Sequence, residues 1–204
     1  MEAHSLMQRI AAILVVVAAG GACSVSANTV RIYTADFNLP IPRPDPNDPY
    51  ITKGWMDDAV IEVLDHFIIA DLDVGITLTH TNVFDLQISL QNPAGTILTL
   101  NMYNFDEYFE AENYTNTIFD DEAPLSIKEG EAPFTGRFRP LDVLSDFDGT
   151  DAYGLWHLRI CDMWEWNIGT FNHLELIFTP EPSTATLLIL GASLLTLFRP
   201  HRHR

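Results

Sequence analysis

Alternation of apolar and polar residues within Asp71–Leu100 is the strongest constraint on how this chain folds. Apolar residues take the even positions of 72–78 and again of 84–90. A period of two puts one apolar face on a core and one polar face toward water, which predicts half-buried strands. Asn92–Gly95 contains the Pro and Gly that favour a turn, and Thr96–Leu100 follows as a third strand. We therefore expect a three-strand meander as the start of an all-β domain.

The same pattern recurs elsewhere in the chain. Short alternating segments occur at Arg31–Phe37, Ala59–Leu64, Trp156–Cys161 and His173–Phe178. No long helical period occurs before Thr179. About eight short strands separated by turns are typical of a β-sandwich or jelly roll, which is the predicted fold class.

Two stretches interrupt the alternation. Residues 28–58 form a Pro-rich lead-in, because Pro lacks the N–H donor that a central strand needs. Asn101–Asn116 mixes aromatic with acidic residues, which predicts a long surface loop. We expect the sandwich itself to span residues 59–179.

The first 27 residues have the features of a secretory signal peptide. Arg9 provides the positive start, Ile10–Ala19 is an apolar core, and small residues precede a cleavage site between Ala27 and Asn28. A second interpretation, in which cleavage precedes Cys23 and a lipid is attached to that cysteine, stays open. Both interpretations predict an exported chain.

Residues that carry chemistry in enzymes are few. Cys161 is the one cysteine left in the mature chain, so no intramolecular disulfide is expected, and its strand position predicts a small buried side chain. His80 lies on the apolar side of its strand, which predicts a hydrogen-bonded core histidine. No Gly-x-Ser-x-Gly segment occurs, and we expect no catalytic triad. A hydrolase acting through surface carboxylates would need two carboxyl groups about 5–10 Å apart in a deep pocket.

The composition is strongly acidic. A formal net charge of −17 makes nucleic acid a poor partner, since binding it needs a basic surface. Calcium is the cofactor that such a chain favours, because it binds carboxylate and carbonyl oxygens of loops. The alternative is a solvated acidic surface that keeps an exported protein soluble. The candidate ligands are Asp71, Asp73, Asp120, Asp121, Asp146, Asp148 and Asp151.

The C-terminal tail, residues 180–204, differs in kind from the rest. Pro180, Glu181 and Pro182 precede an almost entirely apolar segment at 183–198, and a basic run closes the chain. Sixteen residues span roughly 24 Å as a helix, short for a bilayer core of about 30 Å. The order of apolar segment and basic end predicts a membrane-inserted helix whose basic end stays inside the cell.

This tail resembles the PEP-CTERM sorting signal of exported bacterial proteins. The resemblance implies recognition and processing by an exosortase, a membrane cysteine protease of Gram-negative bacteria that make exopolysaccharide. It implies a chain that is transiently anchored in the inner membrane and then displayed on the cell surface or released.

Several segments of the domain together match the pattern of a known family. They are His80–Thr81, Phe84–Leu90, Asn92–Thr96, Thr117–Ala123, Phe134–Gly149, Gly154–Leu158 and Gly169–Phe171. In these segments the domain resembles the P domain, or Homo B domain, of proprotein convertases and bacterial subtilases. The resemblance implies a jelly-roll β-sandwich, which in the parent proteases packs on and stabilises a separate catalytic domain. Asn167 departs from the pattern, since the family often has Asp there, and His173 stands near a position where many members carry Ser or Trp.

Together these features predict a non-catalytic exported module that binds or scaffolds at the cell surface or in the extracellular matrix. The expected partners are the exosortase, transiently, and exopolysaccharide or another surface protein. The alternative is an accessory stabilising domain for a separately encoded subtilisin-like serine protease.

Overall fold

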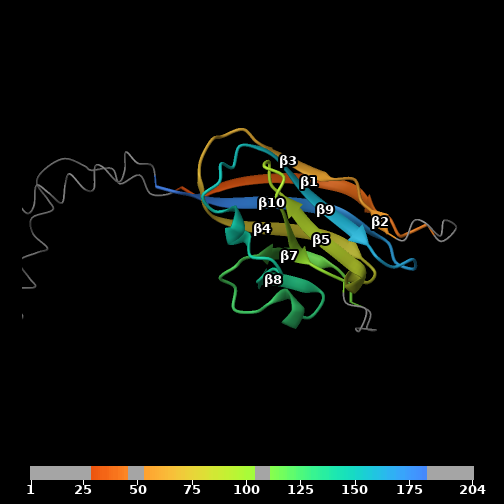
Figure 1. The fold of residues 1–204 in the computed structure, drawn as a ribbon. Coiled ribbons are helices and arrows are strands. Elements are labelled where there is room, and N and C mark those ends of the chain that lie inside the picture. Colours follow the sequence, from red (N-terminus) through yellow and green to blue (C-terminus); the bar gives the residue numbers. More distant parts are fainter. Residues whose placement is uncertain (1–28, 46–52, 104–110, 183–204) are drawn as a thin grey trace, which may run out of the picture. The chain divides into compact units, whose positions relative to one another are not determined.

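The fold, seen in a computed structural model that describes residues 29–45, 53–103 and 111–182, is a sandwich of two β-sheets (Figure 1). The first sheet has the order β1 (Arg31–Ile41), β10 (Gly169–Pro180), β4 (Ile69–His80), β7 (Tyr114–Phe119) and β8 (Phe134–Phe138). The second has the order β2 (Gly54–Trp55), β9 (Gly154–Asp162), β5 (Leu86–Gln91) and β6 (Ile97–Asn101), and β3 (Ala59–Val63) also pairs with β9. All strand pairs are antiparallel except β7 with β8. In the described part of the chain, the 3-10 helices η2 (Val83–Asp85), η3 (Ile127–Glu129) and η4 (Leu144–Phe147) lie between strands.

The all-β sandwich prediction is confirmed, with ten strands where about eight were expected. The predicted signal peptide and the segment at 183–198 lie outside the described residues. Within the described part of the chain, no helix is long and apolar enough to cross a membrane.

The alternating residues build the core as their pattern predicts. Leu174, Leu176 and Phe178 of β10 are completely buried, and so is Trp156 of β9. The Trp156 ring makes edge contacts with Phe147 and Phe178, and its Nε1–H donates to the Ala152 carbonyl at 2.9 Å. The apolar faces of both sheets therefore meet at one aromatic centre.

The predicted meander is wrong in one respect, because β4 belongs to the first sheet and the β5–β6 hairpin to the second. The chain crosses between the sheets at η2. Asn82 begins this short helix, and its side-chain oxygen accepts the Phe84 N–H at 3.3 Å. Alternation reveals which face of each strand is buried, but it does not reveal with which strand that strand pairs.

The loop predicted over Asn101–Asn116 also needs correction, since β7 already begins at Tyr114. Tyr114 is completely buried, whereas Thr115 and Asn116 are exposed. Asn113 and Asn116 have positive φ angles of 66° and 48°. These two irregular positions interrupt the period of two, which is why the sequence pattern concealed the strand.

Proline affects the first strand less than expected. β1 continues through Pro40 to Ile41 with a bulge between Asp36 and Leu39, and it pairs with β10 alone at the edge of its sheet. An edge strand tolerates Pro because one side of its backbone needs no partner.

The opposite edges of the two sheets are β8 and β6. The chain that leaves β8 joins them, because the backbone N–H groups of Leu141 and Asp142 donate to Leu100 and Thr99 at 3.1 and 2.9 Å. The Asp142 carboxylate in turn accepts the Thr99 N–H at 2.7 Å.

Replacing Trp156 by Ala should lower the free energy of unfolding by about 3–5 kcal/mol, since it leaves a cavity at the aromatic centre and an unpaired carbonyl at Ala152. Guanidinium denaturation measures the loss. Trp166→Ala is the control, because this ring is 71% exposed and its removal should cost less than about 0.5 kcal/mol. Equal losses in the two variants would contradict this account of the core.

Candidate functional site

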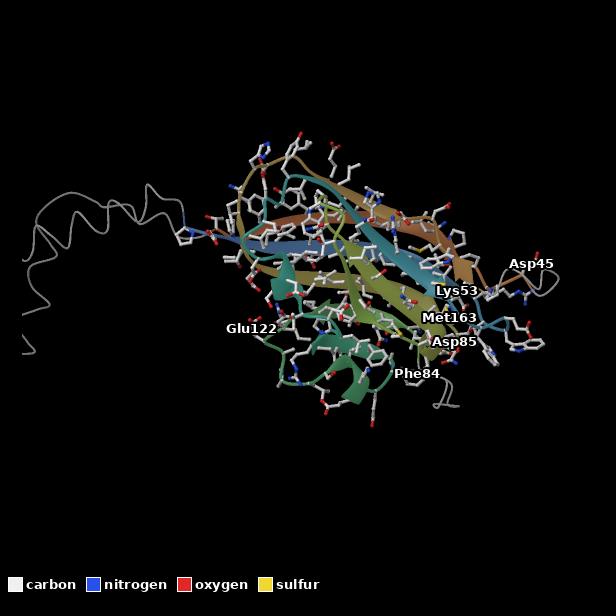
Figure 2. The ribbon with its side chains drawn as sticks, viewed as in Figure 1. Asp45, Lys53, Phe84, Asp85, Glu122 and Met163 are labelled. Carbon is white, nitrogen blue, oxygen red and sulfur yellow. The ribbon has the colours of Figure 1, made fainter. Side chains whose placement is uncertain are left out.

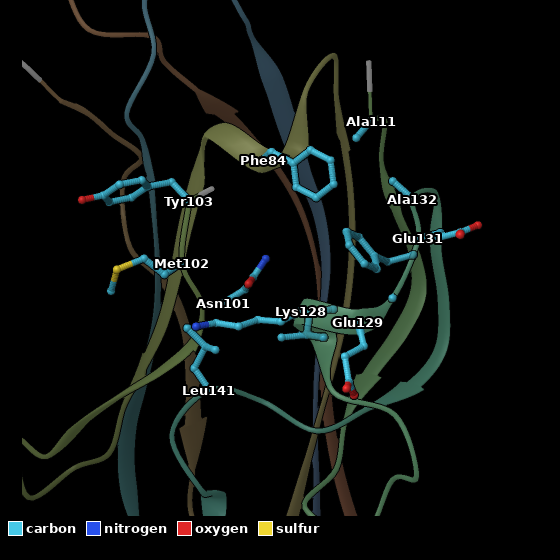
Figure 3. A pocket seen from close by; sticks show the side chains of 13 residues that line it. Phe84, Asn101, Met102, Tyr103, Ala111, Lys128, Glu129, Glu131, Ala132 and Leu141 are labelled. Carbon is cyan, nitrogen blue, oxygen red and sulfur yellow. The ribbon is translucent and has the colours of Figure 1, made fainter. Parts of the chain in front are cut away.

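A cavity of about 950 Å³ lies at the β6–β8 edge of the sandwich (Figure 3). In Figure 3 Phe84 closes one end, Tyr103 and Met102 form one wall, and Ala132 stands on the opposite wall. A volume of this size is in the upper range of small-molecule and side-chain binding pockets. This site has no signal in the sequence, because its residues come from five separate segments.

Aromatic contacts fix the deep wall of the pocket. Phe134, the first residue of β8, stacks on the Tyr114 ring at 4.9 Å and meets Phe84 edge-on at 6.4 Å. The Tyr114 hydroxyl accepts a hydrogen bond from Asn101 Nδ2 at 2.6 Å. Burial raises the pKa of Tyr114, so the hydroxyl stays neutral and the wall carries no charge.

The short helix η3 forms another wall and carries Lys128 into the pocket lining. Ser126 and Glu129 form a capping box, in which each side chain accepts a backbone N–H of the other end. Gly130 follows, and a Cβ at this position would lie 2.6 Å from the Phe138 ring, so only glycine fits. The helix is thus held by its own cap and by two phenyl rings.

Charged groups at the pocket are unevenly placed. In Figure 3 the Lys128 side chain runs across the lower part of the pocket, while the carboxylates of Glu129 and Glu131 point away from its centre. Glu129 also accepts the Ser126 N–H at 3.3 Å and lies 4.0 Å from Arg139. The carboxylate pair that a glycoside hydrolase needs is therefore not directed into this pocket.

The structure brings five of the seven predicted calcium ligands into one acidic cluster: Asp71, Asp73, Asp120, Asp121 and Asp148. Figure 2 shows Glu122, beside this cluster, at the opposite end of the sandwich from Phe84 and Asp85. Asp151 lies elsewhere and binds His66 at 2.7 Å. Asp146 is an exposed residue of η4.

Arg137 neutralises part of the acidic cluster. One guanidinium nitrogen lies 2.7 Å from Asp73 and 2.6 Å from Asp120. Burial raises the pKa of Asp73 in spite of this contact. Burial also acts on Asp120, but Arg137 and the Glu122 N–H outweigh it and lower the pKa of Asp120. Of the two carboxylates that contact Arg137, Asp120 is therefore the one whose charged form is more favoured.

The remaining acids of the cluster are crowded. Burial and the neighbouring Asp120 raise the pKa of Asp71, and burial with Asp71 and Asp121 raises that of Asp148. Both oxygens of Asp121 already accept backbone N–H groups, from Leu144 and Ser145, at 2.9 Å. Across the described residues, no three His, Cys, Asp or Glu side chains are arranged to hold a metal ion. Calcium binding here stays a prediction, and unbalanced negative charge is what favours it.

His80 is the hydrogen-bonded core histidine that its strand position predicts. It is 3% exposed, with Nδ1 at 2.8 Å from the Asn82 carbonyl and Nε2 at 3.3 Å from Asp162. Asn167, where the P-domain pattern often has Asp, donates to the buried Asp85 at 2.6 Å. An amide at this position supplies a donor to Asp85 where an aspartate would add a further negative charge.

Cys161 is buried and free, as its position in the sequence predicts. Burial raises the pKa of its thiol to about 11, so the thiol stays protonated at neutral pH. Its sulfur lies 3.6 Å from the Asp162 carbonyl and 3.7 Å from Met163 Sδ, which fits a packing role.

The predicted sorting motif directly follows the last strand. Pro180 ends β10 opposite Ile69, and the Glu181 N–H donates to the Ile68 carbonyl at 2.8 Å. Glu181 and Pro182 are exposed. Ala27 and Asn28, the predicted cleavage site, lie outside the described residues.

Comparison with known proteins defines the class of this domain. The sequence matches the Proprotein convertase P-domain family over residues 69–178, and the chain belongs to this family. In proprotein convertases the P domain is a non-catalytic accessory domain. No curated protein matches the chain.

Solved structures that match part of the chain include a serine protease of Aeromonas sobria, alone and in a complex with its chaperone. The complex has a TM-score of 0.43 and the protease alone 0.41, both at 15% identity over 74% of this chain. The chain spans 27% of the length of either protease chain. A structure of infectious bursal disease virus matches with a TM-score of 0.24, at 14% identity over 84% of this chain and 48% of that chain.

Replacing Arg137 by Met should destabilise the domain at neutral pH by about 1–2 kcal/mol, because Asp73 and Asp120 lose their partner. The loss is smaller than for a fully buried pair since the Arg137 side chain is 47% exposed. Arg137 lowers the pKa of Asp120 and opposes the rise in the pKa of Asp73, so the deficit should shrink as pH falls through about 4 and both carboxylates take up protons. Urea denaturation between pH 3 and 7 measures this, with Arg43→Met as the control. A deficit that stays constant with pH would contradict the electrostatic explanation.

Millimolar calcium should raise the melting temperature of the domain, because a bound cation offsets repulsion among Asp71, Asp121 and Asp148. Differential scanning calorimetry with calcium and then with chelator measures the shift. In Asp71→Asn the shift should decrease, whereas the control Glu62→Gln, on an exposed position of β3, should retain it. No shift in the unsubstituted protein would remove calcium from the description of this cluster.

Proposed function

We propose that this chain is a non-catalytic exported module that binds a partner at the cell surface or in the extracellular matrix. The observation that carries the proposal is the pocket at the β6–β8 edge, about 950 Å³ in a domain whose family is non-catalytic in proprotein convertases. Eight of its thirteen lining residues are aromatic or aliphatic, polar groups share its surface with them, and the carboxylates of Glu129 and Glu131 point away from its centre. Such a surface serves recognition better than chemistry.

Export and sorting belong to the same proposal. A signal peptide at 1–27 would direct the chain out of the cytoplasm, and the segment from 180 to 204 would anchor it in the inner membrane until an exosortase processes it. The exposed position of Glu181 and Pro182 just after β10 supports access to the motif.

A second candidate function is an accessory domain for a separately encoded subtilisin-like protease. Family membership favours it, because P domains accompany catalytic domains in proprotein convertases. The two proposals differ in the bound partner, a protease in one case and a surface or matrix component in the other.

Capture from the native culture tests the proposal. Immobilised protein should retain a surface protein or a polysaccharide, and Ala132→Trp should abolish retention because the indole fills the pocket. The control is Val143→Trp, at an exposed position that does not line the pocket. Mass spectrometry and sugar analysis identify what is retained. A captured subtilisin-like protease would support the second candidate, and equal retention by both variants would contradict a role for the pocket.

A further inference from the structure

We propose that the pocket at the β6–β8 edge receives a large apolar side chain of a partner polypeptide together with an adjacent carboxylate, which Lys128 binds. This inference rests on the proposed binding function and names the chemistry of the ligand. Three features of the pocket carry it: its aromatic and aliphatic side chains, a lysine with no ion pair to a described residue, and an amide oxygen that accepts no hydrogen bond from a described residue.

The walls fit an apolar side chain. Phe84 and Phe134 lie edge-on at 6.4 Å, and Met102, Ile127 and Leu141 add aliphatic surface. Aromatic rings gain most from edge or offset contacts with another ring, so a Phe or Tyr side chain suits the cavity beside these two rings.

Lys128 carries the one positive charge among the side chains that line this pocket. Neither Lys53 nor Lys128, the two lysines of the described residues, makes an ion pair with a described residue, and only Lys128 lines the pocket. The chain has 28 acidic residues against 11 basic ones, so a cation without an acidic partner is not explained by scarcity of acids. In Figure 3 this ammonium lies on the Met102 and Leu141 side of the pocket, where a carboxylate from a ligand would reach it.

Asn101 adds a third point of contact. Its Nδ2 donates to the Tyr114 hydroxyl at 2.6 Å, and its Oδ1 accepts no hydrogen bond from a described residue. A peptide N–H supplies the matching donor. The three contacts together describe one amino-acid residue, with an apolar side chain, a backbone N–H and a carboxylate at its own chain end or on the next Asp or Glu.

The overall charge restricts the class of ligand further. A net charge of −17 repels polyanions such as acidic polysaccharides, and the outward Glu129 and Glu131 strengthen that repulsion at the rim. A single carboxylate attached to an apolar side chain escapes most of this repulsion. The observations therefore favour a polypeptide over an anionic polymer.

The test uses the full chain in lipid nanodiscs, which accommodate its apolar C-terminal segment and keep detergent out of the pocket. The probes are fluorescent peptides that end in Phe with a free carboxylate, the same peptides amidated, and amidated peptides with internal Phe-Asp or Phe-Lys. Fluorescence anisotropy should show that loss of the carboxylate weakens binding about tenfold or more. Comparing the free-end and Phe-Asp peptides distinguishes a chain terminus from an acidic side chain as the source.

Variants of Lys128 provide the decisive comparison. Lys128→Met should weaken binding of the carboxylate peptides about tenfold and leave binding of the amidated peptides unchanged. Lys128→Glu should reverse the preference, so that the Phe-Lys peptide binds more tightly than the Phe-Asp peptide. Lys53→Met is the matched control and should bind as the unsubstituted protein does. Both lysines are exposed, so the thermal stability of each variant should stay the same.

Each outcome decides between the proposals. Equal binding of acid and amidated peptides, or an unchanged preference in Lys128→Glu, would overturn the assignment of Lys128. Tighter binding of an acidic oligosaccharide than of every peptide would overturn the polypeptide assignment. If Ala132→Trp blocks capture from culture while Lys128 variants do not, this inference fails and the proposed function stands. If neither substitution matters, the proposed function fails as well.

Discussion

Backbone hydrogen bonds from Leu141 and Asp142 to β6 are the interaction on which the organisation of this sandwich depends. The β1 and β3 edges of the two sheets lie next to each other, and at the other edge β6 and β8 are joined by chain that has left the strands. Leu141 of this chain packs against the core and also lines the pocket. The pocket therefore lies where this segment joins the two sheets.

The sequence predicts which face of each strand is buried far better than it predicts which strands pair with each other. Trp156 and Leu176 are buried as the period of two requires, and His80 and Cys161 have the environments expected from their positions. Alternation did not predict that β4 and the β5–β6 hairpin belong to different sheets. The crossing between the sheets occurs at η2, the short helix that Asn82 caps. β7 escaped detection because left-handed backbone at Asn113 and Asn116 interrupts its alternation.

The candidate sites were predictable to different degrees. The acidic composition predicted the cluster around Asp71, but it did not predict that Arg137 contacts this cluster. Arg137 lies on β8, which pairs in parallel with β7. The pocket had no sequence signal, because Phe84, Asn101 and Lys128 belong to segments that approach one another only in the folded chain. Among the residues that line the pocket, Gly130 is the one glycine. The need for glycine there is explained only by the folded structure, in which the Phe138 ring leaves no room for a Cβ.

The sheet edges have a consequence for the behaviour of the protein at high concentration. Exposed strand edges recruit further strands and lead to aggregation, so natural proteins interrupt or cover them. Here β1 carries a bulge and Pro40, and β8 is five residues long with Gly136 at a φ angle of 96°. β6 is covered by the chain after β8. Each of these edges is a poor template for strand addition, which suits a domain that would be crowded on a surface or in a matrix.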